Sequence, residues 1–230
     1  MKMLIIAHRG GKALGPENTI ATMNRSLVVG ADGIEMDVHC CFGKDPVVIH
    51  DETIDRTTNG SGEVAKMSIE SIQQYEVEGG EKVPSLVQVL EEMRQKKPTL
   101  FIELKHPDAA MPTAKIVDHF IRERGYPYNQ IIIISFMHQL LARIHAKYPK
   151  LITGASLQHV SDTLAAPAAH SGSQYILAPI DELTEAFVKD ARSHSLRVVT
   201  WGCDDPNTGK KAIALGVDGI ITADPSLFVD

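Results

Sequence analysis

The stretch QIIIIS at residues 130–135 holds four successive isoleucines and has no polar alternation. A strand that is buried on both faces of a parallel sheet has this pattern, because helices cover both of its sides. Runs of the same kind recur along the chain, and most of them are rich in isoleucine, valine and leucine. They lie at residues 3–7, 33–38, 46–49, 99–104, 151–155, 174–177, 196–201 and 217–221.

Segments with apolar residues at helical spacing separate these runs. Many of them begin near a serine, threonine, aspartate or proline, which favours a helix start. The clearest ones lie at residues 85–97, 109–124, 137–147, 182–193 and 206–215. If residues 33–38 and 46–49 form one strand system, the chain has eight βα units. The fold class predicted is therefore α/β, as a TIM-type (β/α)8 barrel, which typically takes about 250 residues.

One stretch interrupts the alternation of strands and helices. Residues 52–83 are polar and rich in glycine and threonine, with one weak helical pattern at residues 68–75. A connection of this length within a compact domain is usually functional or forms a small subdomain. We predict a single domain over residues 1–230, with residues 52–83 as a small inserted subdomain after the second strand.

The composition excludes several classes of protein. Of the 230 residues, 43% are apolar and 23% are charged, and no apolar run approaches the length of a membrane span. The N-terminal segment MKMLIIAHRGG favours a strand over a signal peptide. The net charge of −6 gives no support for nucleic-acid or anionic-lipid binding. Three cysteines, two of them adjacent, favour unpaired buried thiols in a reducing compartment, so we expect a cytoplasmic location.

Carboxylates lie where apolar runs end. Glu35 and Asp37 are two apart on a strand, so their side chains share one face, and Glu103 is placed to join them from the next barrel strand. Neighbouring carboxylates are costly to bury unless a cation neutralises them, and hard divalent cations prefer oxygen ligands. We predict one divalent cation, magnesium or calcium and alternatively manganese. The other interpretation pairs one or two carboxylates with Arg9 or Lys105.

Basic residues lie at the same strand ends. Arg9 and Lys105 would form a cationic pair around the metal, which suits an anionic group such as phosphate. His8 and His50 each follow an apolar run, and two imidazoles can act as base and acid on either side of a phosphorus centre. His39 has the same parity as Asp37 but is left out of the predicted site. Nucleophile-elbow, zinc and nucleotide-binding motifs are absent from the sequence.

The motifs of the chain resemble those of glycerophosphodiester phosphodiesterases. They are AHRG at 7–10, PENT at 16–19, GADGIEMDV at 30–38, VVIHDETIDRTTNGSG at 47–62, VPSL at 83–86, FIELK at 101–105 and GVDGIITADP at 216–225. They cover the chain from end to end in the order found in the family. The combination of HRG, PENT, E-x-D and V-I-H-D makes the resemblance specific.

The resemblance implies a (β/α)8 barrel with a small inserted subdomain and a divalent metal bound by Glu35, Asp37 and Glu103. It also implies that His8 and His50 are the general acid–base pair, with Arg9 and Lys105 around the phosphate. The reaction implied is hydrolysis of a glycerophosphodiester to sn-glycerol 3-phosphate and an alcohol. Trp201 ends a strand where the family also tends to carry tryptophan, and it would form either part of the pocket wall or packing at the barrel mouth.

Other functions remain open at this point. The nearest alternative is a lysophospholipase D-like phosphodiesterase, although the sequence shows no amphipathic stretch for a lipid surface. A non-catalytic barrel that binds phosphate esters is a second alternative, but both histidines and all three carboxylates are present. We favour His8 as base and His50 as acid. The sequence leaves open the head-group alcohol, the oligomeric state, and whether water or the glycerol 2-hydroxyl attacks the phosphorus.

Overall fold

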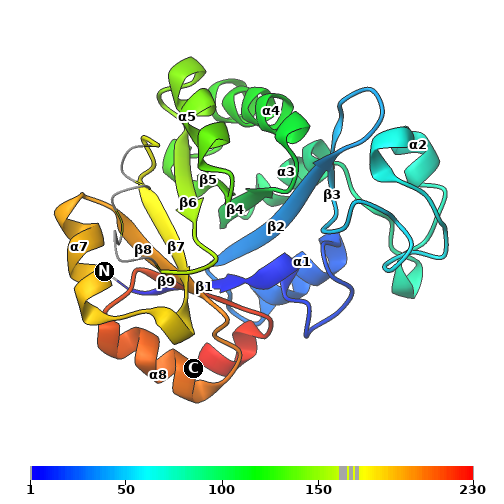
Figure 1. Cartoon of the computed structure of the whole chain (residues 1–230). Coiled ribbons are helices and arrows are strands. Elements are labelled where there is room, and N and C mark those ends of the chain that lie inside the picture. Colours follow the sequence, from blue (N-terminus) through cyan, green and yellow to red (C-terminus); the bar gives the residue numbers. More distant parts are fainter. Residues whose placement is uncertain (1, 161–164, 166–167, 169–170, 230) are drawn as a thin grey trace.

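Eight parallel strands close into a barrel in the computed structural model, which describes residues 2–160, 165, 168 and 171–229 (Figure 1). Neighbouring strands follow the order β1-β9-β8-β7-β6-β5-β4-β2, and β1 pairs again with β2 to complete the ring. The strands are β1 Leu4–Ala7, β2 Gly33–Cys40, β4 Thr99–Leu104, β5 Ile131–Ser135, β6 Ile152–Ser156, β7 Tyr175–Pro179, β8 Arg197–Trp201 and β9 Gly219–Thr222. The predicted TIM-type (β/α)8 fold is therefore confirmed.

The remaining strand, β3 (Pro46–Val48), pairs antiparallel with β2 and stays outside the ring. The interpretation of residues 33–38 and 46–49 as one strand system is correct for this reason. The hairpin places the residues that follow β3 at the same end of the barrel as the end of β2. Residues far apart in the sequence thus meet at one rim.

The barrel interior is filled by side chains. Phe101 of β4 meets Tyr175 of β7 edge to face, with ring centroids 5.7 Å apart. Ile6, Ile132 and Leu177 belong to the same interior cluster. Two further apolar clusters lie between the strands and the surrounding helices. Because side chains fill the interior, the barrel is a packed core and not a pore.

The helices surround the barrel as the spacing of apolar residues predicts (Figure 1). Most begin at an N-cap side chain, such as the capping boxes of Ser85 and Asp205. Two helices are shorter than predicted. The one predicted at residues 85–97 ends before Lys97, which has a φ of 49°, and the one predicted at residues 182–193 starts after a 3₁₀ turn. The helices are α1 Ile20–Val28, α3 Leu86–Met93, α4 Ala110–Glu123, α5 His138–Lys147, α7 Glu185–Ser193 and α8 Pro206–Leu215. The sequence patterns named no helix where α1 forms.

Residues 52–83 lie beside β3 at one side of the barrel (Figure 1). They contain the short helix α2 (Ile69–Ile72) and three-residue 3₁₀ turns at Val64–Lys66 and Glu78–Gly80. Their apolar side chains gather in a small cluster of their own, which shares Val47 and Ile49 with the barrel hairpin. From this we propose that they form a small insertion within a single domain.

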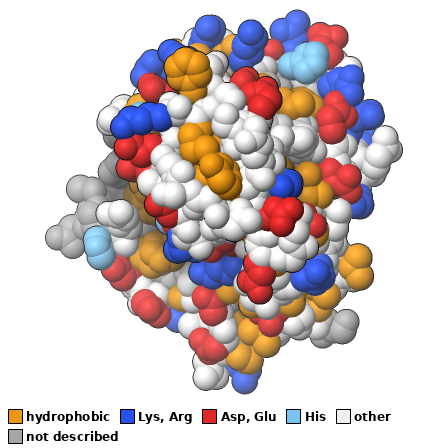
Figure 2. Space-filling view, turned by 90° about the vertical axis from the view of Figure 1, so that its right-hand side faces the viewer, with side chains coloured by type: hydrophobic (Ala, Val, Ile, Leu, Met, Phe, Trp, Pro, Cys, Tyr) orange, Lys and Arg blue, Asp and Glu red, His pale blue; other side chains and the backbone are white. Residues whose placement is uncertain are grey.

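Polar and apolar side chains are interspersed on the face turned toward the viewer in Figure 2, where Lys and Arg alternate with Asp and Glu. Among the described residues, no helix is long and apolar enough to cross a membrane. Cys40, Cys41 and Cys203 are buried and free, as the sequence predicted. Burial raises the pKa of Cys40 and of Cys203 to about 12, so neither thiol ionises near neutral pH.

Candidate active site

All eight predicted site residues line one cleft of about 350 Å³ at the carboxyl ends of the barrel strands. His8 and Arg9 form the turn directly after β1. Glu35 and Asp37 project from β2, and Glu103 and Lys105 lie at the end of β4. His50 follows β3, and Trp201 ends β8. The barrel thus brings together residues from five separate parts of the sequence.

Three carboxylates form the floor of the cleft. Asp37 and Glu103 are register partners on adjacent strands, and each of the three residues offers an oxygen within 4.8 Å of the others. Glu35 is 2% exposed and Asp37 is 1% exposed. Burial, followed by the charges of Asp37 and Glu103, raises the pKa of Glu35 well above its usual value. Burial and the charge of Asp37 also raise the pKa of Glu103.

These carboxylates fit a hard divalent cation. The Oε1 atom of Glu35 is buried and has no hydrogen-bond partner among the described residues. A buried carboxylate oxygen without a partner is unfavourable unless it binds a cation. Three convergent oxygen donors are the ligand type that magnesium, calcium and manganese prefer. The predicted metal ligands are therefore placed where one ion could contact all three.

The two predicted phosphate-binding cations lie against these carboxylates. The backbone amide of Arg9 donates to Glu35 Oε2 at 2.8 Å. The side-chain Nε of Arg9 lies 3.6 Å from Asp37 Oδ2. Lys105 Nζ donates to Glu103 at 2.8 Å and lies 3.5 Å from Asp37. Burial would lower the pKa of Lys105, but Glu103 and Asp37 raise it, so the amine stays charged. Pairing with cations and a metal-ligand role are both compatible with this geometry.

Asn18 holds Asp37 in place, although the sequence analysis did not select it. Its side-chain Nδ2 donates to Asp37 Oδ2 at 3.0 Å, and its Oδ1 accepts from the Asp37 amide at 3.3 Å. The Asn18 amide in turn donates to the Arg9 carbonyl at 2.7 Å. Asn18 has a φ of 58°, a conformation that asparagine tolerates better than most residues. The signal for it was its position within PENT at residues 16–19.

His8 lies at the edge of the carboxylate cluster. Its Nε2 is 3.9 Å from Glu35 Oε2, and about a third of its side chain is exposed to the cleft. Burial, followed by the charges of Lys12 and Arg9, lowers the pKa of His8 to about 4. The imidazole is therefore neutral near pH 7 and is able to accept a proton.

His50 is oriented by the residue that follows it. Its Nδ1 lies 2.6 Å from Asp51 Oδ1, and an ionised carboxylate can only accept, so Nδ1 carries the proton. The other ring nitrogen, Nε2, is then left for a partner in the cleft. His39 Nε2 lies 3.0 Å from the His50 carbonyl oxygen, which places His39 beneath His50.

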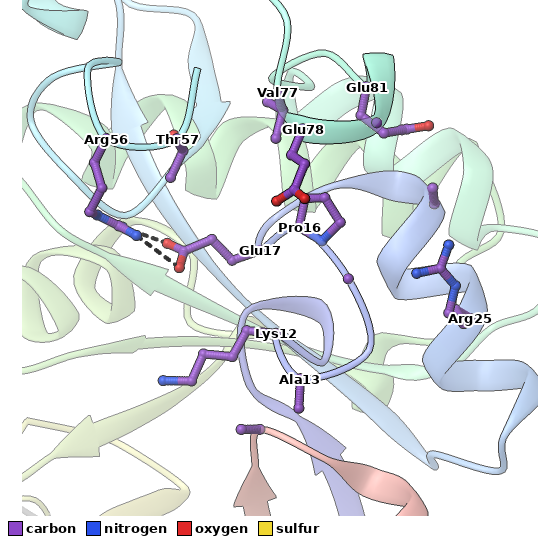
Figure 3. Close-up of a pocket in the computed structure, with 14 residues that line it drawn as sticks. Lys12, Ala13, Pro16, Glu17, Arg25, Arg56, Thr57, Val77, Glu78 and Glu81 are labelled. Atoms are coloured by element: carbon purple, nitrogen blue, oxygen red, sulfur yellow. Dashed lines mark hydrogen bonds and ion pairs between the residues drawn. The ribbon is translucent and has the colours of Figure 1, made fainter. Parts of the chain in front are cut away.

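Two further ionic residues complete the rim. Arg56, from the segment after β3, donates hydrogen bonds to Asp51. It also donates to Glu17, as Figure 3 shows. Glu17 Oε1 also accepts from Arg9 at 3.1 Å. Burial raises the pKa of Glu17, but hydrogen bonds and charges from Arg56 and Arg9 outweigh it and lower the pKa overall. Glu17, Asp51 and Arg56 lie in two of the family motifs, but the sequence alone predicted no role for them.

Apolar side chains also line the cleft. They are Ile134, Phe136, Leu177 and Ile221, together with the half-buried Trp201. Trp201 also packs against the interior cluster of the barrel, so it both lines the cleft and closes the core. Its indole Nε1 is buried and has no hydrogen-bond partner among the described residues. The cleft can therefore contact both charged groups and carbon atoms of a bound molecule.

Known sequences resemble this chain over nearly its whole length. The model of the glycerophosphoryl diester phosphodiesterase family matches residues 8–227. A glycerophosphodiester phosphodiesterase of Caldanaerobacter subterraneus subsp. tengcongensis is 34% identical over 246 residues, covering 100% of this chain and 98% of that protein. One of Bacillus altitudinis is 30% identical, covering 98% and 96%.

Solved structures have the same barrel. A glycerophosphodiester phosphodiesterase from Agrobacterium tumefaciens matches with a TM-score of 0.84 and 28% identity, covering 99% of both chains. A phosphodiesterase from Oleispira antarctica, solved with its product sn-glycerol 3-phosphate, matches with a TM-score of 0.87 and 21% identity. That match covers 97% of this chain and 94% of the Oleispira chain.

Proposed function

The chain belongs to the glycerophosphoryl diester phosphodiesterase family, and on this basis we propose that it hydrolyses glycerophosphodiesters to sn-glycerol 3-phosphate and an alcohol. The observation that carries the proposal is the composition of a single cleft. Three carboxylates, two cations and two imidazoles converge there, and apolar side chains line the same cleft. Such a cleft fits a phosphodiester whose glycerol part lies against the apolar side chains.

Glu35, Asp37 and Glu103 would hold one divalent cation, for which magnesium, calcium and manganese are candidates. The bound ion would neutralise charge on the nonbridging phosphate oxygens. Arg9 and Lys105 would contact the same oxygens and orient the phosphate between the two imidazoles. Glu35 is the ligand best supported, because its Oε1 atom is buried without a hydrogen-bond partner among the described residues.

The two histidines would divide the proton transfers. His8 would act as the base that removes a proton from the attacking oxygen, because burial keeps its imidazole neutral near pH 7. His50 would act as the acid that gives the leaving alkoxide a proton from Nε2, which requires the ring to carry a proton on both nitrogens while Nδ1 donates to Asp51. Trp201 would contact the carbon part of the substrate. The attacking oxygen is either water or the glycerol 2-hydroxyl, which would first give a cyclic phosphate.

The first test is release of sn-glycerol 3-phosphate from glycerophosphocholine, with magnesium or calcium and with a chelator. Release that requires the metal is the expected result. Absence of release from this substrate and from its ethanolamine, inositol and glycerol counterparts would contradict the proposal. It would favour a lysophospholipase D-like activity or a barrel that only binds phosphate esters.

A His50→Ala variant tests the assignment of the acid. We expect a loss in kcat of about 10²–10⁴-fold on diesters whose leaving group is an alkyl alcohol. A p-nitrophenyl ester of glycerol phosphate should lose much less, because its leaving group departs without a proton. Equal losses on both esters would contradict the role of His50 as acid.

The cytoplasmic location expected from the cysteines stays a prediction, which fractionation of the source cells would test.

A further inference from the structure

Arg56 joins the insertion to the barrel. It lies within the insertion, residues 52–83, whereas its partner Glu17 lies on the loop after β1 (Figure 3). Its guanidinium makes four hydrogen bonds to two carboxylates. Nε and Nη2 donate to Asp51 at 2.6 and 3.0 Å, and Nη1 and Nη2 donate to Glu17 at 3.1 and 2.7 Å.

Asp51 joins this guanidinium to His50. One of its oxygens, Oδ1, accepts from both His50 Nδ1 and Arg56 Nη2. The other oxygen accepts from Arg56 Nε. Both oxygens of Asp51 are therefore held by Arg56, so the carboxylate plane is fixed relative to the imidazole ring. Without the hydrogen bonds from Arg56, the Asp51 carboxylate could rotate about its side-chain bonds. The hydrogen bond that it accepts from His50 Nδ1 would then be lost.

Glu17 keeps Arg56 from moving. Arg56 is half exposed, and an exposed ion pair with one partner adds little rigidity. Glu17 is more buried and is itself held by Arg9, whose amide donates to Glu35. The contacts thus run without interruption from the carboxylate floor through Arg9, Glu17, Arg56 and Asp51 to His50.

We propose that Arg56 is a positioning residue for the phosphodiester reaction, which holds the Asp51 carboxylate and through it the imidazole of His50. The inference rests on the proposed function, because His50 acts there as the acid. It gives the insertion a direct part in the active site. A guanidinium is needed because its planar fork can engage two carboxylates at once, which a lysine ammonium does not do with the same geometry.

The variant Arg56→Met keeps much of the side-chain length and removes the donors. We expect kcat for an alkyl diester to fall by about 30-fold, which is less than the roughly 10²–10⁴-fold expected for loss of the acid itself. On the p-nitrophenyl ester we expect a loss of less than about 3-fold, because that leaving group needs no acid. Arg56→Lys should give an intermediate loss on the alkyl diester. Equal losses on both esters in Arg56→Met would overturn the proposal.

Lys66→Met is the matched control. Lys66 is a cation of the same insertion, but within the described residues its only ion pair is with Glu63, at 2.8 Å, and its side chain is 73% exposed. This variant should keep wild-type kcat on both esters. A loss in Lys66→Met with the same leaving-group pattern would overturn the assignment to Arg56, since any disturbance of the insertion would then suffice.

A spectroscopic measurement separates this proposal from the proposed function. With ¹⁵N-histidine, the protected Nδ1 proton of His50, assigned by its loss in His50→Gln, should appear in the wild type and in Lys66→Met. It should weaken or vanish in Arg56→Met. An unchanged signal in Arg56→Met would overturn the positioning role. If the signal behaves as expected but the wild type hydrolyses no glycerophosphodiester, the proposed function fails on its own.

Discussion

Two groups of acidic side chains lie at the mouth of the same barrel, one on the floor of the cleft and one on its rim. Their pKa values shift in opposite directions. Burial and mutual repulsion raise the pKa of Glu35 and Glu103 on the floor. On the rim, hydrogen bonds from Arg56 lower the pKa of Asp51, and the pKa of Glu17 is lowered as well. The protein itself pairs the rim carboxylates, whereas on the floor one buried oxygen, Glu35 Oε1, has no hydrogen-bond partner among the described residues.

The difference separates two uses of a buried negative charge. A carboxylate whose partners are all protein groups holds neighbouring side chains in place, as Asp51 does for His50. A carboxylate with a raised pKa and an unpartnered oxygen is destabilising until a ligand arrives. The same residue type thus supports geometry at one place and binding at the other.

Removing the charge of Glu35 should have the strongest effect. Glu35→Gln should lower metal-dependent kcat/KM by about 10³-fold or more, because one anionic ligand is lost. The same change should raise the Tm of the metal-free protein by about 2–4 °C, since it removes a repelled buried charge. The carboxamide oxygen of the variant could still accept the Arg9 amide proton. Activity assays and thermal melts in chelator measure both effects.

Glu17→Gln is the matched control on the rim. It removes a charge that two arginines stabilise, so the Tm of the metal-free protein should fall by about 2–4 °C. A fall in Tm for both variants would mean that the floor carboxylates are as well satisfied as the rim ones. That result would contradict the difference between the two groups.

A smaller effect is expected from Asn18→Ala, because this variant leaves all three floor carboxylates in place. Removing the hydrogen bonds to Asp37 should weaken metal binding by about 10–100-fold, the usual cost of losing a group that orients a ligand. Titration calorimetry with magnesium or calcium measures it. Asn24→Ala is the control, because Asn24 also donates to a carboxylate, that of Glu92, away from the cleft. Equal weakening in both variants would contradict a specific role for Asn18.

The smallest expected effect concerns pH. Because the folded pKa values of Glu35 and Glu103 are raised, the folded chain binds more protons than the unfolded chain between their usual and raised pKa values. The stability of the metal-free protein should therefore fall as pH rises through that window. Metal binding needs ionised carboxylates, so magnesium should raise the Tm by about 3 °C more at about pH 8 than at about pH 5. A pH-independent shift would argue against binding at these residues.

The strands and the residues on them could be predicted from the sequence because strand geometry is local. The parity of Glu35 and Asp37 fixes their shared face whatever the rest of the chain does. Asn18, Arg56 and Glu17 were not selected because their roles depend on how loops fold over the barrel mouth. Asn18 meets Asp37 across 19 positions, and Arg56 meets Glu17 across 39. Periodicity carries no information about such contacts.

Arg9 has a further consequence for how this sequence could change. It adopts φ 50° and ψ 40°, a left-handed conformation that costs most residues roughly 1 kcal/mol relative to glycine. Selection for thermal robustness alone would favour glycine there, whereas the guanidinium contacts to Glu17 and Asp37 favour arginine. Position 9 is therefore a place where the two selective pressures conflict, and a consensus-based stabilisation of this protein should leave it unchanged.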